Sequence, residues 1–429
     1  MRRRSAYCIA VLGMWLCYTT SHADTHTDAS HVLVRTPQFV ARRSGLALVV
    51  DLQTPHRVLS TSTEYGGMRH KLRHIVNMQS MEGRSHDTRI QERLSAGSAH
   101  YHRQSVLPLH LPPDKTALMG TAAHLGHLGH TSKSFQNLRV DAFATAGVHG
   151  NAVAAGDPAR YYQSLDGSGT KPAELPPGTI NIIVLINHPL KAGAMVKAVT
   201  VAVEAKSAAL QALAVPSRQS NRLATGTGTD QVSLAAPLTG SGPALESASQ
   251  HLKLGELIGA AVQAAVSDAL QKQNGLSPDR TRSLPHALGR YGFDDEKLRA
   301  GAASYLGGEV LQNLQDNVLA VIHEPRVASA AFAYATVLDR VQYGTISGTA
   351  VGEALRDQAA LLAVAVAQRP LLYGQFWLEL GSTFDGWDAA KSSEDLSPII
   401  HAVALGFAQK WATSPAARGT AKPTKAGKR

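Results

Sequence analysis

The stretch TINIIVLI, from Thr179 to Ile186, is the strongest local structural signal in the chain. It is dense in β-branched residues, and turn-forming residues flank it, with Pro176-Pro177-Gly178 before it and Asn187-His188-Pro189 after it. A short apolar run bounded in this way predicts a central β-strand. The next segment, Met195–Val215, is rich in alanine and has apolar periodicity, which predicts a packed helix.

Other segments around this strand carry further strand and helix patterns. Strands are predicted at Leu46–Leu52, Arg57–Ser62, Val140–Ala146 and Gln231–Ala236, a helix at Leu252–Gln273, and an ordered element at Ala117–Leu128. We interpret three polar stretches as a lead-in at 24–45, a surface excursion at Met81–Lys115 and a loop at Asp157–Pro177. Strands followed by helices predict an α/β fold, here an α+β layered sandwich of the αββα type.

The C-terminal third of the chain has a different pattern. Helices are predicted at Leu298–Ile322, Arg326–Val341, Gly348–Ala367 and Ile399–Trp411. No catalytic motif stands out there. We therefore predict four parts, which are a signal peptide at 1–23, an α/β domain at 24–275, a helical C-terminal unit at 276–410 and a disordered basic tail at 411–429.

The first 23 residues have the composition of a secretory signal. Arg2-Arg3-Arg4 forms a charged start, Ile9–Tyr18 is an apolar stretch, and Ser21-His22-Ala23 offers a cleavage site. The apolar stretch is too short to span a bilayer, so no integral membrane span is predicted. A periplasmic or secreted protein is expected, and the alternative is an N-terminal helix that stays attached.

The cysteines and charges limit which catalytic groups and which partners need to be considered. Both cysteines, Cys8 and Cys17, lie inside the predicted signal, so the mature chain would have no disulfide and no thiolate nucleophile. The net charge is +10, but the signal carries three arginines and the tail five basic residues, without any acid, which leaves +2 for the body. A nucleic-acid partner is therefore not needed to explain the basic character. The sequence gives no subunit number.

Five segments, taken in order, carry a family resemblance. They are Val58–Gly67 (VLSTSTEYGG), Ala144–Gly156 (ATAGVHGNAVAAG), Gly178–Ala209, Ala224–Asp230 (ATGTGTD) and His251–Gly259 (HLKLGELIG). In this order they resemble the adenosylcobinamide amidohydrolases, over roughly Leu46 to Gly275, which would make 24–275 the amidohydrolase domain. The resemblance implies hydrolysis of the amide that joins an aminopropanol arm to a corrinoid, giving a cobyric-acid-type corrinoid and 1-amino-2-propanol. The corrinoid is then the substrate, and no separate cofactor is implied. Export departs from this family, whose members are usually cytoplasmic.

Amide hydrolysis needs a nucleophile, donors for the developing oxyanion and an acid for the leaving amine. Gly178-Thr179, followed by an apolar strand and an Ala-rich helix, also resembles the self-processing site of the β-aminopeptidase and ornithine acetyltransferase group. That resemblance implies that Thr179 is the nucleophile and that its hydroxyl cuts the peptide bond before it, leaving an N-terminal amine as base. It also places Asn151 near the nucleophile, and Thr227 and Asp230 in a downstream polar loop. The ordinary alternative is a threonine that only begins a strand.

Three further ionisable residues are candidates for the site. Glu204 and Lys206 lie two positions apart on the predicted helix and do not share a face, so one of the two is expected in the site and the other in solvent. Glu204 would orient or deprotonate a group, and Lys206 would stabilise the oxyanion. His251 would donate a proton to the departing amine, or it simply satisfies backbone groups where a helix begins.

Substrate binding is assigned to Gly66, Gly67 and Asn181. The two glycines would permit an unusual turn or a close approach of the large corrin ring.

Three histidines, His124, His127 and His130, are spaced by three. On a helix they would lie along one face and could bind a metal or the corrin cobalt. Gly126 and Gly129 weaken such a helix, and no acidic residue lies among the histidines. We interpret them as surface histidines and predict no metal site.

The sequence leaves three functions open. The leading hypothesis is an exported amidohydrolase that acts on cobinamide or a related cobamide. The second is a non-catalytic protein that captures a corrinoid for import. The third is an N-terminal-nucleophile peptidase or amidase that acts on another amide.

Overall fold

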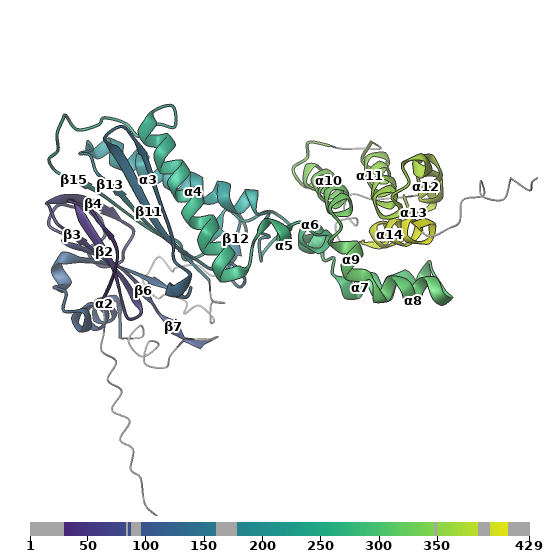
Figure 1. Cartoon of the computed structure of the whole chain (residues 1–429), viewed down its shortest axis with the longest axis horizontal. Coiled ribbons are helices and arrows are strands. Elements are labelled where there is room, and N and C mark those ends of the chain that lie inside the picture. The colour runs from purple at the N-terminus through teal and green to yellow at the C-terminus, as the bar shows by residue number, and fades with distance from the viewer. Residues whose placement is uncertain are drawn as a thin grey trace, which may run out of the picture.

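A computed structural model describes residues 30–82, 85–86, 96–159, 178–346, 350–384 and 395–410. The predicted signal peptide, the predicted basic tail and most of the predicted loop Asp157–Pro177 lie outside these residues. Figure 1 shows a sandwich of sheets and helices at one end of the molecule and a group of helices at the other. The predicted fold class, a layered sandwich with a helical C-terminal extension, is confirmed.

Two mixed sheets form the sandwich. The five-stranded sheet has the order β1 (His31–Arg35), β2 (Phe39–Ser44), β3 (Ala47–Leu52), β6 (His74–Gln79) and β9 (Thr116–Thr121). The six-stranded sheet has the order β10 (Gly129–Phe135), β11 (Leu138–Ala146), β13 (Ile180–Ile186), β15 (Gln231–Pro237), β4 (His56–Ser60) and β5 (Gly67–Arg69). The predicted strands match β3, β4, β11, β13 and β15 at nearly the same bounds.

Strand β13 lies between β11 and β15 in the six-stranded sheet. Its Ile180, Ile182 and Ile186 belong to the core under the helices, whereas Ile183 and Leu185 face the other sheet. A strand that is covered on both faces needs apolar side chains on both, which explains the unbroken apolar run.

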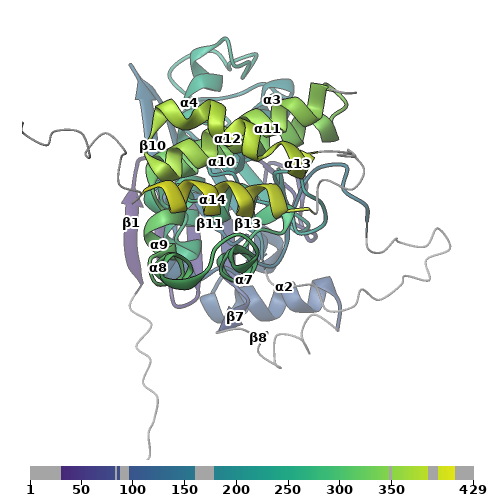
Figure 2. The ribbon, with the colours of Figure 1, turned by 90° about the vertical axis from the view of Figure 1, so that its right-hand side faces the viewer.

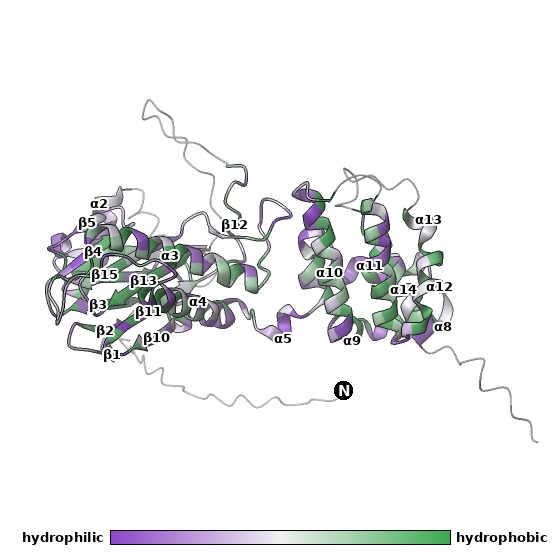
Figure 3. Cartoon of the chain, turned by 90° about the horizontal axis from the view of Figure 1, so that it is seen from above, coloured by the Kyte–Doolittle hydropathy of each residue, from purple (hydrophilic) through white to green (hydrophobic). Residues whose placement is uncertain are grey.

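Helices cover the outer faces of both sheets. On the six-stranded sheet, α3 (Ala192–Ala212) contacts β15 and α4 (Lys253–Asn274) contacts β10 and β11. On the five-stranded sheet, α2 (Ser98–Val106) contacts β9 and contributes Val106 to a small core with Val49 and Val76. The layers therefore run helix, sheet, sheet, helix, as predicted. Figure 3 shows the hydrophobic colour concentrated along β11, β13 and β15, inside these layers.

Two interpretations of the N-terminal region are wrong. The predicted polar lead-in contains β1 and β2, and the predicted surface excursion contains α2, whose His102 and Val106 are buried. Edge strands and amphipathic helices expose part of their side chains, so a polar composition does not exclude them. Strands β6 and β10 also have no counterpart among the predicted strands, because polar residues interrupt their apolar positions.

Beyond α4, the described part of the chain is helical. The longest helices are α10 (Pro325–Gln342), α11 (Ala350–Ala367) and α14 (Ser397–Lys410), which match three predicted helices. The predicted helix Leu298–Ile322 is wrong as a single element, since α7 (Asp295–Gly301), α8 (Gly308–Asp316) and α9 (Val318–Ile322) replace it. Gly308, the first residue of α8, has a φ of 55°, which a residue with a side chain adopts only with strain. The chain changes direction at this glycine, which separates α7 from α8.

Short elements complete the helical part. They are α5 (Pro278–Thr281), α6 (Leu284–Leu288), α12 (Tyr373–Glu379) and α13 (Gly381–Phe384). A separate hydrophobic core, which includes Phe376, fills this part of the molecule. Figure 2 shows α10, α11 and α14 stacked in front of the sandwich. Among the described residues, no helix combines the length and apolarity needed to cross a bilayer.

Candidate functional site

The candidate site forms where β13 and β15 begin. These two strands are parallel, and Asn181 pairs with Gln231 in their register. Thr179 directly precedes β13, and Thr229 and Asp230 directly precede β15. Parallel pairing therefore places the beginnings of the two strands side by side, although the residues are 50 positions apart in the chain.

The carbonyl oxygen of Gly178 is held by two side-chain donors. Asn151 Nδ2 donates to it at 3.0 Å, and Thr229 Oγ1 donates to it at 2.9 Å. Thr179 Oγ1, on the next residue, donates to the Thr229 carbonyl oxygen at 2.8 Å. A Cβ atom on residue 178 would lie 2.9 Å from the Gly147 carbonyl oxygen, so only glycine fits here without a shift of the backbone. Two side-chain donors thus converge on one peptide carbonyl oxygen.

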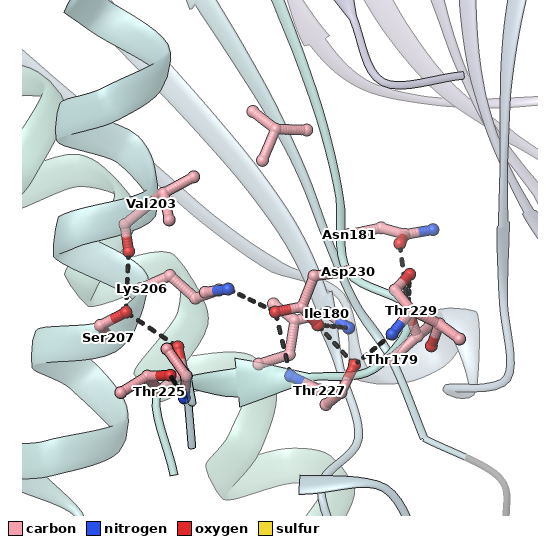
Figure 4. Close-up of polar contacts among 12 residues, drawn as sticks. Thr179, Ile180, Asn181, Val203, Lys206, Ser207, Thr225, Thr227, Thr229 and Asp230 are labelled. Carbon is pink, nitrogen blue, oxygen red and sulfur yellow. Dashed lines mark hydrogen bonds and ion pairs between the residues drawn. The ribbon is translucent and has the colours of Figure 1, made fainter. Parts of the chain in front are cut away.

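A mostly buried carboxylate connects the loop to the strand. Asp230 Oδ1 accepts from the Ile180 backbone nitrogen at 3.0 Å and from Thr227 Oγ1 at 2.5 Å. Asp230 Oδ2 accepts from the Thr227 backbone nitrogen at 3.1 Å and pairs with the Lys206 ammonium. The side chains of Lys206 and Asp230 are only 8% and 13% exposed, so this ion pair is largely shielded from solvent. Figure 4 shows Lys206 reaching from α3 to Asp230, with Thr179 and Thr229 beyond it.

Most of the predicted catalytic residues lie in one connected network. Thr179, Asn151, Thr227, Asp230 and Lys206 are all linked to it by the hydrogen bonds described above. Their catalytic roles stay predictions.

Two predicted residues lie outside this network. Glu204 is exposed and pairs with the Gln250 side chain, and His251 is exposed where the chain turns into α4. Glu204 and Lys206 point in different directions from α3, one to solvent and one to the site, as their spacing predicts. Glu204 lines a groove of about 410 Å³ between α3 and β4, together with apolar residues that include Val199 and Val203.

The three predicted substrate-binding residues have different settings. Asn181 is 1% exposed and lies between the two sheets, so it forms the wall beneath Thr179 rather than a surface open to substrate. Gly66 has no room for a side chain, because a Cβ atom would lie 2.0 Å from the Ser62 carbonyl oxygen. Gly67 has a φ of 72°, so the predicted unusual turn is present at the start of β5.

Thr229 is a site residue that the sequence interpretation misses. Its hydroxyl and its carbonyl contact both sides of the Gly178–Thr179 bond. The signal was present in the alternation of ATGTGTD, where the last threonine adjoins the carboxylate residue, but several threonines there compete for the role.

The three spaced histidines do not converge on one point. His124 Nδ1 accepts from the Gly126 backbone nitrogen, His127 Nδ1 bonds the Gln273 side chain, and His130 bonds Asp141. No group of three potential metal ligands occurs in the residues that the structure describes.

Comparison with known proteins identifies the family to which this chain belongs. The family model for adenosylcobinamide amidohydrolase (CbiZ) matches residues 31–278, which is more than half of the chain. An uncharacterized protein of Methanocaldococcus jannaschii, MJ1613, is 29% identical over 236 residues, covering 53% of this chain and 86% of that protein. The crystal structure of the PH0078 protein from Pyrococcus horikoshii overlaps 57% of this chain and 83% of its own with 10% identity and a TM-score of 0.29, which is too low to carry an argument. The match over residues 31–278 is decisive, and the chain belongs to the adenosylcobinamide amidohydrolase family.

Proposed function

We propose that this protein hydrolyses the amide between the aminopropanol arm and the corrin side chain of adenosylcobinamide or a related cobamide. The products would be a cobyric-acid-type corrinoid and 1-amino-2-propanol. The observation that carries the proposal is the Gly178 carbonyl oxygen, held by Asn151 Nδ2 and Thr229 Oγ1 beside the Thr179 hydroxyl. Two donors that converge on a carbonyl oxygen next to a hydroxyl supply the two main requirements of acyl transfer.

In the proposed reaction, Thr179 Oγ attacks the amide carbon of the substrate. Asn151 and Thr229 stabilise the negative charge on the carbonyl oxygen, in the place that Gly178 fills in the intact chain. The proton of the Thr179 hydroxyl passes to the leaving amine as the amide C–N bond breaks, and water then hydrolyses the threonine ester to release the corrinoid acid and restore the hydroxyl. The Lys206–Asp230 pair holds the loop from Thr227 in position through its bond to the Ile180 backbone nitrogen.

Substrate access leads to a second step of the proposal. Thr179 is 3% exposed and the Gly178 carbonyl fills the donor pair, so a substrate carbonyl fits only after Gly178 leaves. Attack of Thr179 Oγ on the Gly178 carbonyl carbon, with departure of the Thr179 nitrogen, would form an ester. The α-amine of Thr179 is freed as this ester forms. Water would then hydrolyse the ester to a Gly178 carboxylate and the Thr179 hydroxyl, and the free amine can serve as the base.

We place this activity outside the cytoplasm. The proposal rests on the charged start, the apolar stretch and the small-residue cleavage site within the first 23 residues.

The test is to incubate the purified protein with adenosylcobinamide and to measure 1-amino-2-propanol by mass spectrometry. Thr179→Ala should lower the rate at least about 1,000-fold, because it removes the nucleophile. The intact mass should show two fragments that meet at Thr179 in the parent protein and one chain in the variant. Thr336→Ala is the matched control, since this exposed threonine on α10 bonds, among the residues that the structure describes, the Phe332 carbonyl within its own helix.

Two outcomes would overturn the proposal in favour of the other hypotheses. Corrinoid binding, seen as a spectral shift, with no amine released by a folded protein would indicate a capture protein. Hydrolysis of β-amino acid amides, with none of corrinoids, would indicate an N-terminal-nucleophile peptidase.

A further inference from the structure

Two buried amides link the two sheets directly below Thr179. Asn77 lies on β6 of the five-stranded sheet and is 2% exposed, and Asn181 lies on β13 of the six-stranded sheet and is 1% exposed. Asn181 Nδ2 donates to Asn77 Oδ1 at 2.8 Å. Thr179 Oγ1 lies 3.4 Å from Asn181 Oδ1, which is the second and more distant acceptor within reach of its single hydroxyl hydrogen. Asn77, from the five-stranded sheet, is thus linked to the candidate nucleophile through Asn181.

The orientation of both amides follows from their partners. Asn181 Nδ2 also donates to the Gly120 carbonyl oxygen at 2.8 Å, and a carbonyl oxygen can only accept. Both Nδ2 hydrogens of Asn181 are therefore used, which turns its Oδ1 toward Thr179. Asn77 must then offer its oxygen to Asn181, and its own Nδ2 donates to Thr145 Oγ1 at 2.9 Å.

The chain of hydrogen bonds continues away from the site. Thr145 Oγ1 donates to Thr121 Oγ1 at 3.1 Å, and Thr121 Oγ1 also accepts from the Ala123 backbone nitrogen. All four side chains are buried between sheets whose other inward residues are mainly apolar. Buried polar groups stabilise a fold less than apolar packing does, so a chain of them in which every side-chain nitrogen and oxygen has a partner, and which reaches the Thr179 hydroxyl, suggests a task at that hydroxyl.

We propose that Asn77 is a positioning residue for Thr179 and acts through Asn181. This inference rests on the proposed function, because it takes Thr179 as the nucleophile. A neutral amide cannot remove a proton from threonine at ordinary pH, so Asn77 and Asn181 are not bases. Asn77 fixes the Asn181 oxygen as the alternative acceptor to the Thr229 carbonyl, so the single hydrogen of the Thr179 hydroxyl is limited to these two directions.

A positioning role affects the chemical step and not substrate binding. Asn77 is enclosed between the sheets, so its replacement should leave KM unchanged. Misplacement of a nucleophile lowers the rate by about 10- to 100-fold, and this loss should appear in kcat.

The experiment compares Asn77→Leu, Asn181→Leu and the double variant. Two readouts are measured, namely kcat and KM for adenosylcobinamide, and the rate at which a β-lactone acylates Thr179, followed by peptide mass spectrometry. Each single variant should lose about 10- to 100-fold in both kcat and acylation rate. The double variant should be no slower than Asn181→Leu alone, because the two residues act through one path. Multiplied effects, or an unchanged acylation rate in folded Asn77→Leu, would overturn the inference.

Two further variants separate positioning from folding. Asn77→Asp keeps an acceptor toward Asn181 and should retain most of the rate, which also tests the inference if Asn77→Leu does not fold; a loss like that of Asn77→Leu would overturn it. Asn187→Leu is the matched control, since Asn187 lies at the other end of the same strand with both amide atoms bonded. It should change stability and leave both readouts at the parent level, and a rate loss equal to that of Asn77→Leu would count against a specific role.

The two readouts also separate this inference from the proposed function. If the parent protein is acylated at Thr179 in an Asn77-dependent way but hydrolyses no corrinoid, the substrate assignment fails and the positioning role stands. If it hydrolyses the corrinoid and Asn77→Leu matches the control, the positioning role fails and the function stands. If Thr179 neither reacts nor supports hydrolysis, both fail.

Discussion

The sandwich and the helical unit differ in how many polar side chains they bury. Among the described residues, those that are buried and polar or charged lie almost entirely in the sandwich, and past residue 276 only Ser283 is buried to the same degree. The core of the helical unit consists of Leu, Ala, Val, Ile, Phe and Tyr side chains. Burying a polar group is unfavourable unless it is hydrogen-bonded, so a concentration of such groups in one region points to chemistry there.

Partly buried polar side chains of the helical unit lie at its contact with the sandwich. Arg290 pairs with Asp339 on α10 and donates to the Asn221 carbonyl oxygen of the sandwich at 2.7 Å. His286 forms a second link, to the Leu213 carbonyl oxygen at 2.7 Å. Partly buried polar side chains of the helical unit thus take part in its attachment to the sandwich. In the sandwich, the buried polar side chains include Asn151, Asn181 and Thr227 around Thr179. The family match, over residues 31–278, covers the sandwich and ends near this contact.

The largest effect is expected from Asp230→Ala. It leaves the Lys206 ammonium buried without its carboxylate, which should lower the free energy of unfolding by about 3–5 kcal/mol and abolish hydrolysis. Chemical denaturation, followed by circular dichroism, measures the first effect, and amine release measures the second. The double variant Asp230→Ala/Lys206→Met should regain much of the stability and none of the activity.

An exposed ion pair provides the control for Asp230. Lys191 pairs with Glu246 near the start of α3, with side chains 59% and 75% exposed. Glu246→Ala should leave both the denaturation curve and the hydrolysis rate unchanged, because exposed pairs contribute little. Equal losses in the two variants would contradict the idea that polar burial in the sandwich is special.

The site could be predicted in part because its residues adjoin strong patterns. Thr179 and Asp230 each precede an apolar strand, and parallel pairing of two such strands brings their beginnings together. Asn77 could not be found in this way, since it interrupts the apolar positions of β6 and its partner Asn181 is 104 residues away. Glu204 illustrates the opposite problem, because a charged residue near a motif shows from sequence alone neither its direction nor its partner.

A smaller and more local effect is expected from Phe376→Ala in the helical unit. Phe376 is fully buried there, so its truncation should lower the free energy of unfolding of that unit by about 3–5 kcal/mol. If the two cores unfold independently, calorimetry should show one transition shifted to lower temperature and the other unchanged. Corrinoid hydrolysis at 25 °C should stay at the parent rate. A loss of hydrolysis in the folded variant would show that the helical unit takes part in the reaction.

The smallest effect concerns a carboxylate in the sandwich that lies away from Thr179. Burial alone would raise the pKa of Asp141, but hydrogen bonds from His130 and Arg139 hold that pKa below its ordinary value. A carboxyl whose pKa is lowered in the folded state contributes stability above its unfolded pKa and loses that contribution as the pH falls through its folded pKa. The stability difference between the parent and Asp141→Asn should therefore be largest near neutral pH and shrink below about pH 4, the ordinary pKa of an aspartate.

Hydrolysis near neutral pH should be unchanged, because no hydrogen bond joins Asp141 to the network around Thr179 in the described structure. A difference that grows as the pH falls would reverse the assigned sign. A loss of activity would show that polar burial throughout the sandwich, and not only beside Thr179, supports the reaction.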